Sequence, residues 1–424
     1  MPIRTTAGLD PTLPNDAEID DDGMVSVGGC RLDDLARQWG TALYVVSPHQ
    51  LRHDAAQWQT LTQAVRPNSS VHFASKALPA LAVLKLFADA GLNVDVSTGG
   101  ELEYALAAGF TGERILVHGN AKSEAELRRG VEVGVRFFVA DNLYDIERLA
   151  HLGSRDQPIG IVIRVIPEVP PATHNMMATA HRGQKFGFEP EQLEEAVRAT
   201  MSAPGLQFLG YHAHVGSQIT DLEPFLQSIR RLASLEPPAV LDIGGGLGIG
   251  YRPNDVVPSL NAYCATVLGE LNSLLDDDCH LVMEPGRHLV AKACVTVYRV
   301  ETVKRGTTAT FVGCDGGTSD NMEVILEFHP QHALVLGKSG PLEACRLVGK
   351  HCDSGDVLIR DVELANPEPG DLIALPATGA YSHAMASNYN LVPRPAMVFA
   401  ESGTARVVVR RDTLADMMGR ESFG

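Results

Sequence analysis

Short apolar runs, each followed by a stretch with helical spacing, recur eight times in the first two thirds of the 424-residue chain. Nearly continuous apolar runs that alternate with helices indicate parallel strands buried on both faces. Eight such units within about 215 residues favour a closed (β/α)8 barrel over an open doubly wound sheet. The runs are Val71–Ala74, Asn93–Val96, Arg114–Val117, Val135–Val139, Ile159–Val165, Phe208–Ala213, Val240–Ile243 and Leu281–Glu284.

The pattern changes after about residue 290, where strand-like runs follow one another with turns and few long helices between them. This change predicts a second, mostly antiparallel β domain, built as a sandwich or a barrel. The early runs Met24–Val27 and Ala42–Val46 are expected to join that domain or to bridge the two. We therefore predict an N-terminal segment over residues 1–46 that contributes to the β domain, a barrel over 47–290 and a C-terminal β domain over 291–424.

Composition excludes several classes of partner. A net charge of −17 argues against nucleic acid, because phosphate binding needs clustered lysine and arginine. The chain has no run of ~18 apolar residues, and its acidic, proline-broken N-terminus is unlike a signal peptide. Seven scattered cysteines without a CxxC pair are typical of reduced thiols. We expect a cytoplasmic enzyme with no nucleic-acid or membrane partner.

Polar or glycine-rich residues follow six of the predicted strands. In a (β/α)8 barrel the chemistry lies at the C-terminal ends of the strands. Lys76 follows the first strand, and an amine in that place is suited to attach an aldehyde cofactor covalently. A single lysine is more commonly a solvated surface residue, so the hypothesis depends on its neighbours in the barrel. They are Ser97 with Gly99–Glu101, His118–Asn120, His214–Ser217, Asp242–Gly246 and Glu284–Arg287.

The run Gly244–Gly246 follows the seventh strand, where barrels of this type often bind a phosphate. Glycines allow consecutive backbone N–H groups to converge on an anion. An isolated glycine run is more commonly a tight turn, but Ser217 and Arg287 offer a hydroxyl and a charge to the same phosphate.

Glu284 and His214 suggest what the phosphate belongs to. A carboxylate facing a pyridine nitrogen keeps that nitrogen protonated and so strengthens pyridoxal phosphate as an electron sink. The alternative for Glu284 is a salt bridge with Arg287, three residues along the chain. His214 is either a satisfied core residue or a ring that stacks on the cofactor. Together these residues predict a pyridoxal-phosphate site on Lys76.

The chain resembles diaminopimelate decarboxylases and, more broadly, the fold-type III decarboxylases that include ornithine and arginine decarboxylases. The similar segments cover residues 40–400 in order. They are HFASKAL at 72–78, DVSTGGELEYA at 95–105, ILVHGNAKS at 115–123, KFGF at 185–188, GYHAHVGSQI at 210–219, LDIGGGLGIGY at 241–251, EPGRHLVA at 284–291, KHCDSGD at 350–356 and GAYSHAMASNYN at 379–390.

The resemblance implies roles for individual residues. Lys76 would carry pyridoxal 5′-phosphate, with His214 stacked on its ring and Glu284 paired with the ring nitrogen. The other cofactor contacts it implies are Ser97, His118, Ser217, Gly244, Gly245, Gly246, Arg287 and Tyr381. The family also implies a head-to-tail homodimer with shared active sites. Cys352 and Asp353 would enter from the other subunit, the thiol as proton donor, while Arg287, Asp353 and Tyr381 would contact the substrate.

One segment departs from the family pattern. Diaminopimelate decarboxylases usually continue after an Asp-Gly-Gly with an arginine and a tyrosine that grip the distal carboxylate of the substrate. In an ungapped reading this chain has Glu323 and Glu327 in those two places. Glutamate repels a carboxylate that arginine would bind. Either the two glutamates bind a cationic or hydroxylated group of a different substrate, or the segment is realigned and they face solvent.

These observations order the candidate functions by the support that each has in the sequence. The leading hypothesis is decarboxylation of meso-diaminopimelate to L-lysine, a step of lysine biosynthesis. The alternative is a paralogue acting on a basic D- or L-amino acid (lysine, ornithine or arginine) or on a siderophore or natural-product intermediate. Glu284 argues against an alanine-racemase-like enzyme, and the presence of Lys76 and Cys352 argues against an inactive binding homologue. Two histidines near residue 330 are too few ligands to predict a metal site.

Overall fold

The computed structural model describes residues 10–169, 182–326 and 330–422. The chain folds as two compact units. The first comprises Met1–Leu51, Gly250–Asp255 and Val290–Gly424, and the second comprises Arg52–Ile249 and Val256–Leu289. Among the described helices, none combines the length and the apolar character needed to cross a membrane.

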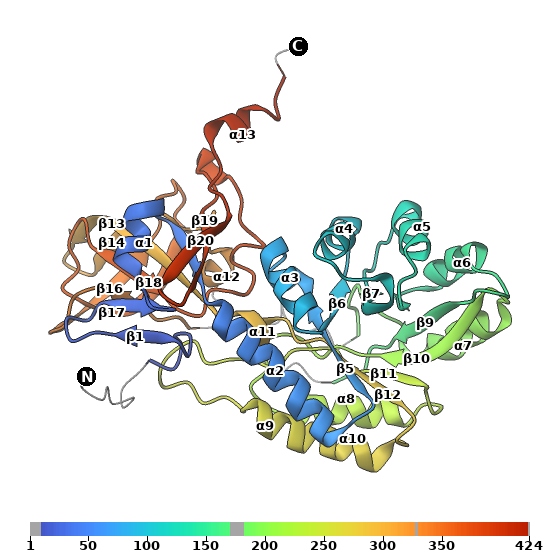
Figure 1. The fold of residues 1–424 in the computed structure, drawn as a ribbon. Helices are drawn as coiled ribbons and strands as arrows, with labels where there is room; N and C mark the ends of the chain where they lie inside the picture. Colours follow the sequence, from blue (N-terminus) through green and yellow to red (C-terminus); the bar gives the residue numbers. More distant parts are fainter. Residues whose placement is uncertain (1–9, 170–181, 327–329, 423–424) are drawn as a thin grey trace. The chain divides into compact units, whose positions relative to one another are not determined.

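Eight parallel strands of the second unit close into a barrel, which confirms the predicted fold (Figure 1). The ring closes where the last strand pairs with the first, with Leu281 opposite Ser69 and Met283 opposite Val71. In chain order the strands are β5 (Ser69–Ala74), β6 (Asn93–Val96), β7 (Ile115–Val117), β8 (Phe137–Ala140), β9 (Ile159–Arg164), β10 (Leu206–His212), β11 (Val240–Asp242) and β12 (His280–Met283).

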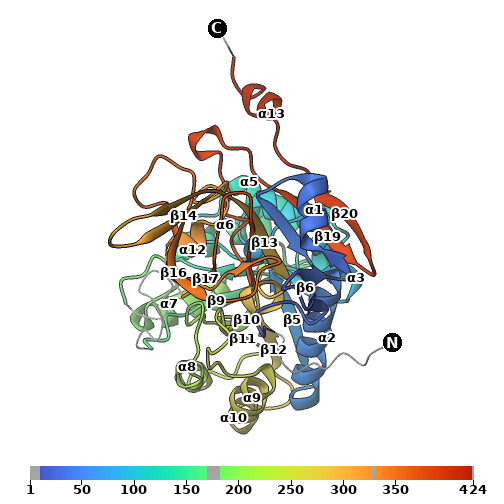
Figure 2. The ribbon, with the colours of Figure 1, turned by 90° about the vertical axis from the view of Figure 1, so that its left-hand side faces the viewer.

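Helices lie outside this ring, and Figure 2 shows α8 to α10 together on one side of it. They are α2 (Pro48–Val65), α3 (Leu81–Asp89), α4 (Gly99–Ala107), α5 (Glu124–Glu132), α6 (Leu143–Leu152), α7 (Leu193–Ser202), α8 (Glu223–Ala233), α9 (Leu260–Tyr263), the π-helical segment Cys264–Leu268, α10 (Gly269–Leu274) and α11 (Arg287–Val290). Several begin where the sequence offers a capping residue. The side chains of Thr98, Ser123 and Asn142 each accept a hydrogen bond from a backbone N–H in the first turn of α4, α5 and α6.

The first unit is built on a nine-stranded sheet whose pairs are mostly antiparallel. Leu43–Val46 lies in the middle of this sheet, between strands from the C-terminal part of the chain. Val25–Val27 pairs instead within a separate three-stranded sheet. The elements are β1 (Ala17–Ile19), β2 (Val25–Val27), β3 (Cys30–Arg31), α1 (Leu32–Trp39), β4 (Leu43–Val46), β13 (Cys294–Arg305), β14 (Thr310–Cys314), α12 (Met322–Ile325), β15 (Leu334–Val335), β16 (Leu342–Val348), β17 (Val357–Ala365), β18 (Leu372–Leu375), β19 (Ala396–Glu401), β20 (Thr404–Val409) and α13 (Leu414–Met418).

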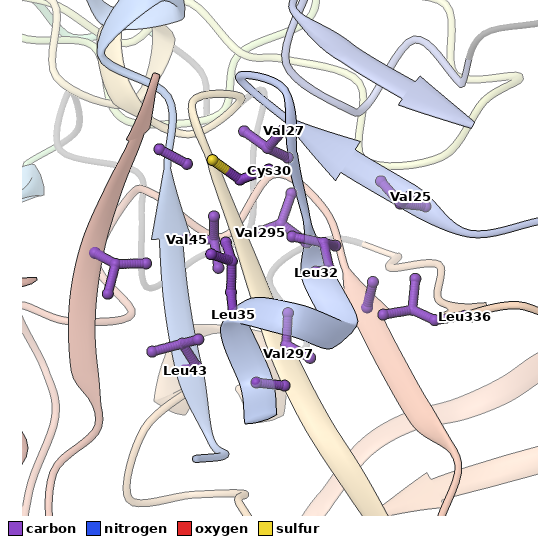
Figure 3. Packing of buried hydrophobic residues seen from close by; sticks show 14 of the residues in the cluster. Val25, Val27, Cys30, Leu32, Leu35, Leu43, Val45, Val295, Val297 and Leu336 are labelled. Carbon is purple, nitrogen blue, oxygen red and sulfur yellow. The ribbon is translucent and has the colours of Figure 1, made fainter. Parts of the chain in front are cut away.

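One apolar cluster joins the two ends of the sequence in this unit (Figure 3). Helix α1 contributes Leu32 and Leu35, which lie on one face because they are three residues apart. Every second residue of β4 and β13 points to the same side of the sheet, which brings Val45 and Val295 into the cluster. Cys30 is also buried there, as a free thiol.

A buried histidine makes the stability of the barrel depend on pH. His72 in β5 has no exposed surface, and its Nε2 lies 3.1 Å from Ser70 Oγ and 3.3 Å from Asn93 Nδ2. Burial lowers the pKa of His72 to about 3. The folded barrel therefore keeps this imidazole neutral, while the unfolded chain takes up a proton as the pH falls below about 6.5.

We expect this difference to remove about 2 kcal/mol of folding stability between pH 7 and pH 5. In urea denaturation at the two pH values, His72→Gln should lose that part of the pH dependence, although it should also be less stable at both. His151→Gln is the control, because His151 is an exposed residue of α6. A pH dependence unchanged in His72→Gln would contradict the expectation.

Candidate active site

Inside the barrel, a layer of polar side chains lies next to an apolar layer, on the side of the C-terminal ends of the strands. The apolar layer includes Leu116, Val139, Val162, Val240 and Val282. Two residues further along a strand, the side chain points to the same side and lies nearer the C-terminal end. Each of these apolar residues is followed at that spacing by a polar one, namely His118, Asp141, Arg164, Asp242 and Glu284 in the same order.

Lys76 lies at this polar end of the barrel, in the single 3-10 turn Ser75–Ala77 that follows β5. Its side chain is 48% exposed, and its Nζ lies 3.4 Å from Asp95 Oδ2. Asp95 in β6 is buried, which raises the pKa of its carboxyl, although the charge of Lys76 opposes the shift. The amine of Lys76 thus lies near the carboxyl group of Asp95, and the lysine side chain is still accessible from solvent.

Glu284 is the centre of the buried polar cluster. It hydrogen-bonds His118 Nε2, and His212 Nε2 lies 3.4 Å from its other oxygen. Burial raises the pKa of Glu284, but the two imidazoles outweigh burial and hold this pKa well below its usual range. Burial and the charge of Glu284 raise the pKa of Asp242 well above its usual range. The pKa values of the two acids therefore shift in opposite directions, which favours the charged form of Glu284 and the neutral form of Asp242.

His214 follows β10 and is neutral. Burial, followed by the charge of Lys76, lowers the pKa of His214 well below its usual range. The backbone N–H of Gly245 donates to His214 Nδ1 over 3.2 Å, and only a neutral ring can accept there. This hydrogen bond fixes the imidazole beside the glycine run.

The glycine run is required by the packing of three loops. A Cβ on Gly245 would lie 2.1 Å from the carbonyl oxygen of Glu284, and one on Gly246 would lie 2.4 Å from that of Gly216. Gly244 also has a positive φ of 65°. Backbone therefore packs on backbone here, and the N–H groups of Gly244 and Gly245 donate to Asp242 and His214.

Arg287 lies next to the same loops, at the start of α11. Its Nε and Nη2 donate to Ser217 Oγ over 3.3 and 3.2 Å. The two residues expected to bind a phosphate together are thus in contact, although 70 positions apart in the chain.

The structure brings most of the predicted site residues together in the barrel unit. Ser97 is among them, and its backbone N–H donates to Glu101 Oε2 over 2.6 Å. The other unit, called the β unit because it contains the nine-stranded sheet, includes Tyr381, Cys352, Asp353 and Glu323. Glu327 lies outside the described residues.

The predicted site residues of the β unit differ in exposure and in backbone conformation. Glu323 in α12 is 3% exposed, so the hypothesis that it faces solvent is wrong. Cys352 is the one exposed cysteine of the seven. Asp353 is exposed and accepts a hydrogen bond from the Tyr389 hydroxyl over 3.3 Å. Tyr381 has a positive φ of 64°, a conformation that non-glycine residues rarely adopt.

Sequence analysis did not single out five polar residues at this end of the barrel. They are Asp95, Asp141, Arg164, His212 and, as an acid separate from the glycine run, Asp242. Asp95, Arg164 and His212 lie within or at the last residue of their strands, whereas the predicted site residues of the barrel lie beyond the strand ends. The alternation of side chains along each strand was the available signal, because it predicts which polar residue points inward.

The side chains in the barrel fit pyridoxal phosphate. The hydroxyl of Ser217 and the charge of Arg287 suit its phosphate, Glu284 with its lowered pKa suits a protonated ring nitrogen, and Lys76 suits its aldehyde. His118, His212, Asp242 and Glu284 also have possible ligand atoms within 4.8 Å of one another, an arrangement that can hold a metal ion. In this structure Glu284 is instead hydrogen-bonded to His118, and Asp242 accepts a hydrogen bond from the N–H of Gly244.

A (β/α)8 barrel with a lysine, a glycine run and a buried glutamate at its C-terminal end has the features of a class of pyridoxal-phosphate enzymes. Residues 49–291 match the family model of the pyridoxal-dependent decarboxylase, pyridoxal binding domain. The chain belongs to this family of pyridoxal-dependent decarboxylases. The family confirms pyridoxal phosphate as the cofactor and amino-acid decarboxylation as the reaction class.

Similar proteins support the assignment over nearly the whole chain. A diaminopimelate decarboxylase of Actinosynnema pretiosum is 39% identical over 94% of this chain and 93% of its own. The diaminopimelate decarboxylase of Bacillus subtilis is 35% identical over 93% and 94% of the two chains. A crystal structure of diaminopimelate decarboxylase from M. jannaschii superposes with a TM-score of 0.90 at 28% identity, over 96% of this chain and 98% of that one.

Proposed function

We propose that this decarboxylase converts meso-diaminopimelate to L-lysine and CO2, as a step of lysine biosynthesis. The observation that carries the proposal is the similarity to diaminopimelate decarboxylases, which extends over both the barrel and the β unit. The test is release of CO2 from meso-diaminopimelate by the purified holoenzyme. No release at any substrate concentration would refute the substrate assignment.

Three residues of the barrel have separate roles in the proposed reaction. Bound pyridoxal phosphate supplies an electron sink for the electron pair left behind when the α-carboxylate departs as CO2. Lys76 would hold the cofactor through its amine. Glu284 holds a proton on the ring nitrogen, because a nearby anion favours the charged form of a base. His214, as a neutral imidazole, covers the ring without adding charge.

The other proposed site residues bind the cofactor or the substrate. Ser97 and His118 contact the cofactor in this proposal, and His118 also orients Glu284 through the hydrogen bond described above. Ser217, Gly244–Gly246, Arg287 and Tyr381 hold the phosphate. Arg287, Asp353 and Tyr381 also contact the substrate, and Cys352 returns a proton to the carbon that lost its carboxylate.

We also propose that the enzyme is a homodimer in which Cys352 and Asp353 complete the active site of the partner subunit. Lys76→Ala and Cys352→Ala chains, each impaired alone, should then restore activity when they are mixed under conditions that exchange subunits. About a quarter of the sites would be intact, because half of randomly mixed dimers are hybrids with one complete site in two. Mixed chains no more active than either variant alone would refute shared sites. A cytoplasmic location belongs to the same proposal and is supported by the seven free cysteines.

The buried position of Glu323 supports a second candidate, a paralogue with a changed substrate. A buried carboxylate in place of an arginine favours a cationic or hydroxylated distal group over a carboxylate. CO2 release should be compared across meso-diaminopimelate, both enantiomers of lysine and ornithine, and arginine. A higher kcat/KM for one of the basic amino acids would establish the paralogue, and a preference for meso-diaminopimelate would exclude it.

A further inference from the structure

The exposed Cys352 is carried by a tight turn, residues 349–356, between β16 and β17. The turn is closed by its own backbone, since the N–H of Asp356 donates to the carbonyl of Asp353 over 3.1 Å. The N–H of Gly349 donates to the carbonyl of Asp356 over 3.0 Å. These two bonds fix the ends of the turn but leave the orientation of its tip to other contacts.

The carboxylate of Asp356 supplies such contacts. Asp356 is 3% exposed. Its Oδ1 accepts hydrogen bonds from the Thr318 N–H over 2.7 Å and the Thr318 hydroxyl over 2.9 Å. Its Oδ2 accepts from the N–H of His351 over 2.7 Å. One side chain therefore ties the residue next to Cys352 to a neighbouring loop.

Two glycines make room for this carboxylate. A Cβ on Gly317 would lie 2.4 Å from Asp356 Oδ1, and one on Gly349 would lie 2.2 Å from Oδ2. Neither oxygen could stay in place if either glycine carried a side chain. The loops that surround Asp356 are thus shaped to hold its carboxylate in one position.

The tip of the turn is held from its other side by Asn390. Asn390 Oδ1 accepts a hydrogen bond from the Cys352 N–H over 3.2 Å and lies 3.2 Å from His351 Nδ1. The ring of His351 packs against that of Tyr389 with centroids 5.2 Å apart. Asn390 has a positive φ of 52°, a left-handed conformation that asparagine adopts more readily than most residues. The main chain on both sides of the thiol is therefore fixed.

We propose that Asp356 is a positioning residue that sets the location of the Cys352 thiol for proton transfer. The inference rests on the proposed function, in which the S–H bond of Cys352 breaks, a C–H bond forms at the carbon that lost CO2, and solvent reprotonates the thiolate. Asp356 acts through the N–H of His351, the residue adjacent to Cys352. A proton donor displaced by about 1 Å can slow its step on the order of 10²-fold.

A double-mutant cycle on the holoenzyme tests this role. Asp356→Ala should lower kcat on the order of 10²-fold while the cofactor absorbance stays unchanged. In a Cys352→Ala background the same substitution should change kcat by less than about twofold, because the thiol through which it acts is gone. Asp361→Ala, which removes an exposed aspartate of β17, the strand that follows the turn, is the matched control and should retain the wild-type kcat.

Equal losses of kcat from Asp356→Ala in both backgrounds would overturn the proposal, because they would show a general structural role. If Asp356→Ala does not fold, Asp356→Asn replaces it in the cycle, since the amide keeps the shape and the Oδ1 acceptor but not the acceptor for His351. Cys352→Ala with wild-type kcat would instead refute the role of the thiol in the proposed function. The two failures are therefore distinguishable.

Discussion

The Lys76→Ala enzyme is expected to lose its decarboxylase activity and its cofactor absorbance together. Without the amine, the cofactor has no covalent attachment and no internal group to exchange with the amine of the substrate. We expect kcat to fall by at least about 10³-fold. The absorption band near the visible edge should also be lost from the purified protein, measured after removal of free cofactor.

Lys85→Ala is the matched control, because Lys85 is an exposed lysine of α3 that pairs with Asp89 on the same helix. It should keep both the absorbance and the wild-type kcat. Circular dichroism should show that both variants are folded. An active Lys76→Ala enzyme with its absorbance intact would place the cofactor attachment elsewhere.

The Glu284→Gln enzyme is expected to bind its cofactor and to react slowly. Glutamine fills the same space but carries no charge, so it cannot hold a proton on the ring nitrogen. His118 and His212 outweigh burial and hold the pKa of Glu284 well below its usual range, which favours the anionic form in the wild-type protein. Removal of a preorganised electrostatic group of this type lowers kcat by about 10²- to 10³-fold.

The Glu284→Gln measurement should separate kcat from KM and record the absorbance of bound cofactor. A large loss of kcat with cofactor still attached is the expected result. Glu124→Gln, which removes an exposed carboxylate of α5 paired with Arg128, should leave kcat unchanged. A wild-type kcat in Glu284→Gln would show that protonation of the ring nitrogen does not limit the reaction, as expected of a racemase-like site.

Much of the site could be predicted from local sequence. Lys76, the Gly244–Gly246 run and Glu284 each follow a recognisable apolar strand, and parallel strands bring their C-terminal ends to one end of a barrel. Residues within the strands, Asp95 and His212 among them, were not predicted. A polar residue inside an apolar run can point into the barrel or away from it, and only the register of the closed sheet decides which.

The ionisation of the buried acids could not be predicted either. Asp242 and Glu284 are both carboxylic acids at the ends of neighbouring strands, yet burial and their partners shift their pKa values in opposite directions. The difference depends on His118 and His212, which come from strands distant in the sequence. For Glu323, sequence analysis could not choose between solvent and interior, and the structure shows it buried.

The sequence by itself determined the barrel, the β domain and the kind of cofactor, because strand alternation, glycine runs and the lysine are properties of short segments. Tertiary structure alone decided which acid carries charge, that Arg287 meets Ser217, and that Asp356 holds the turn of Cys352. Electrostatic and hydrogen-bond interactions depend on distances through space between residues far apart in the chain. Those distances exist only once the sheets have closed and excluded water.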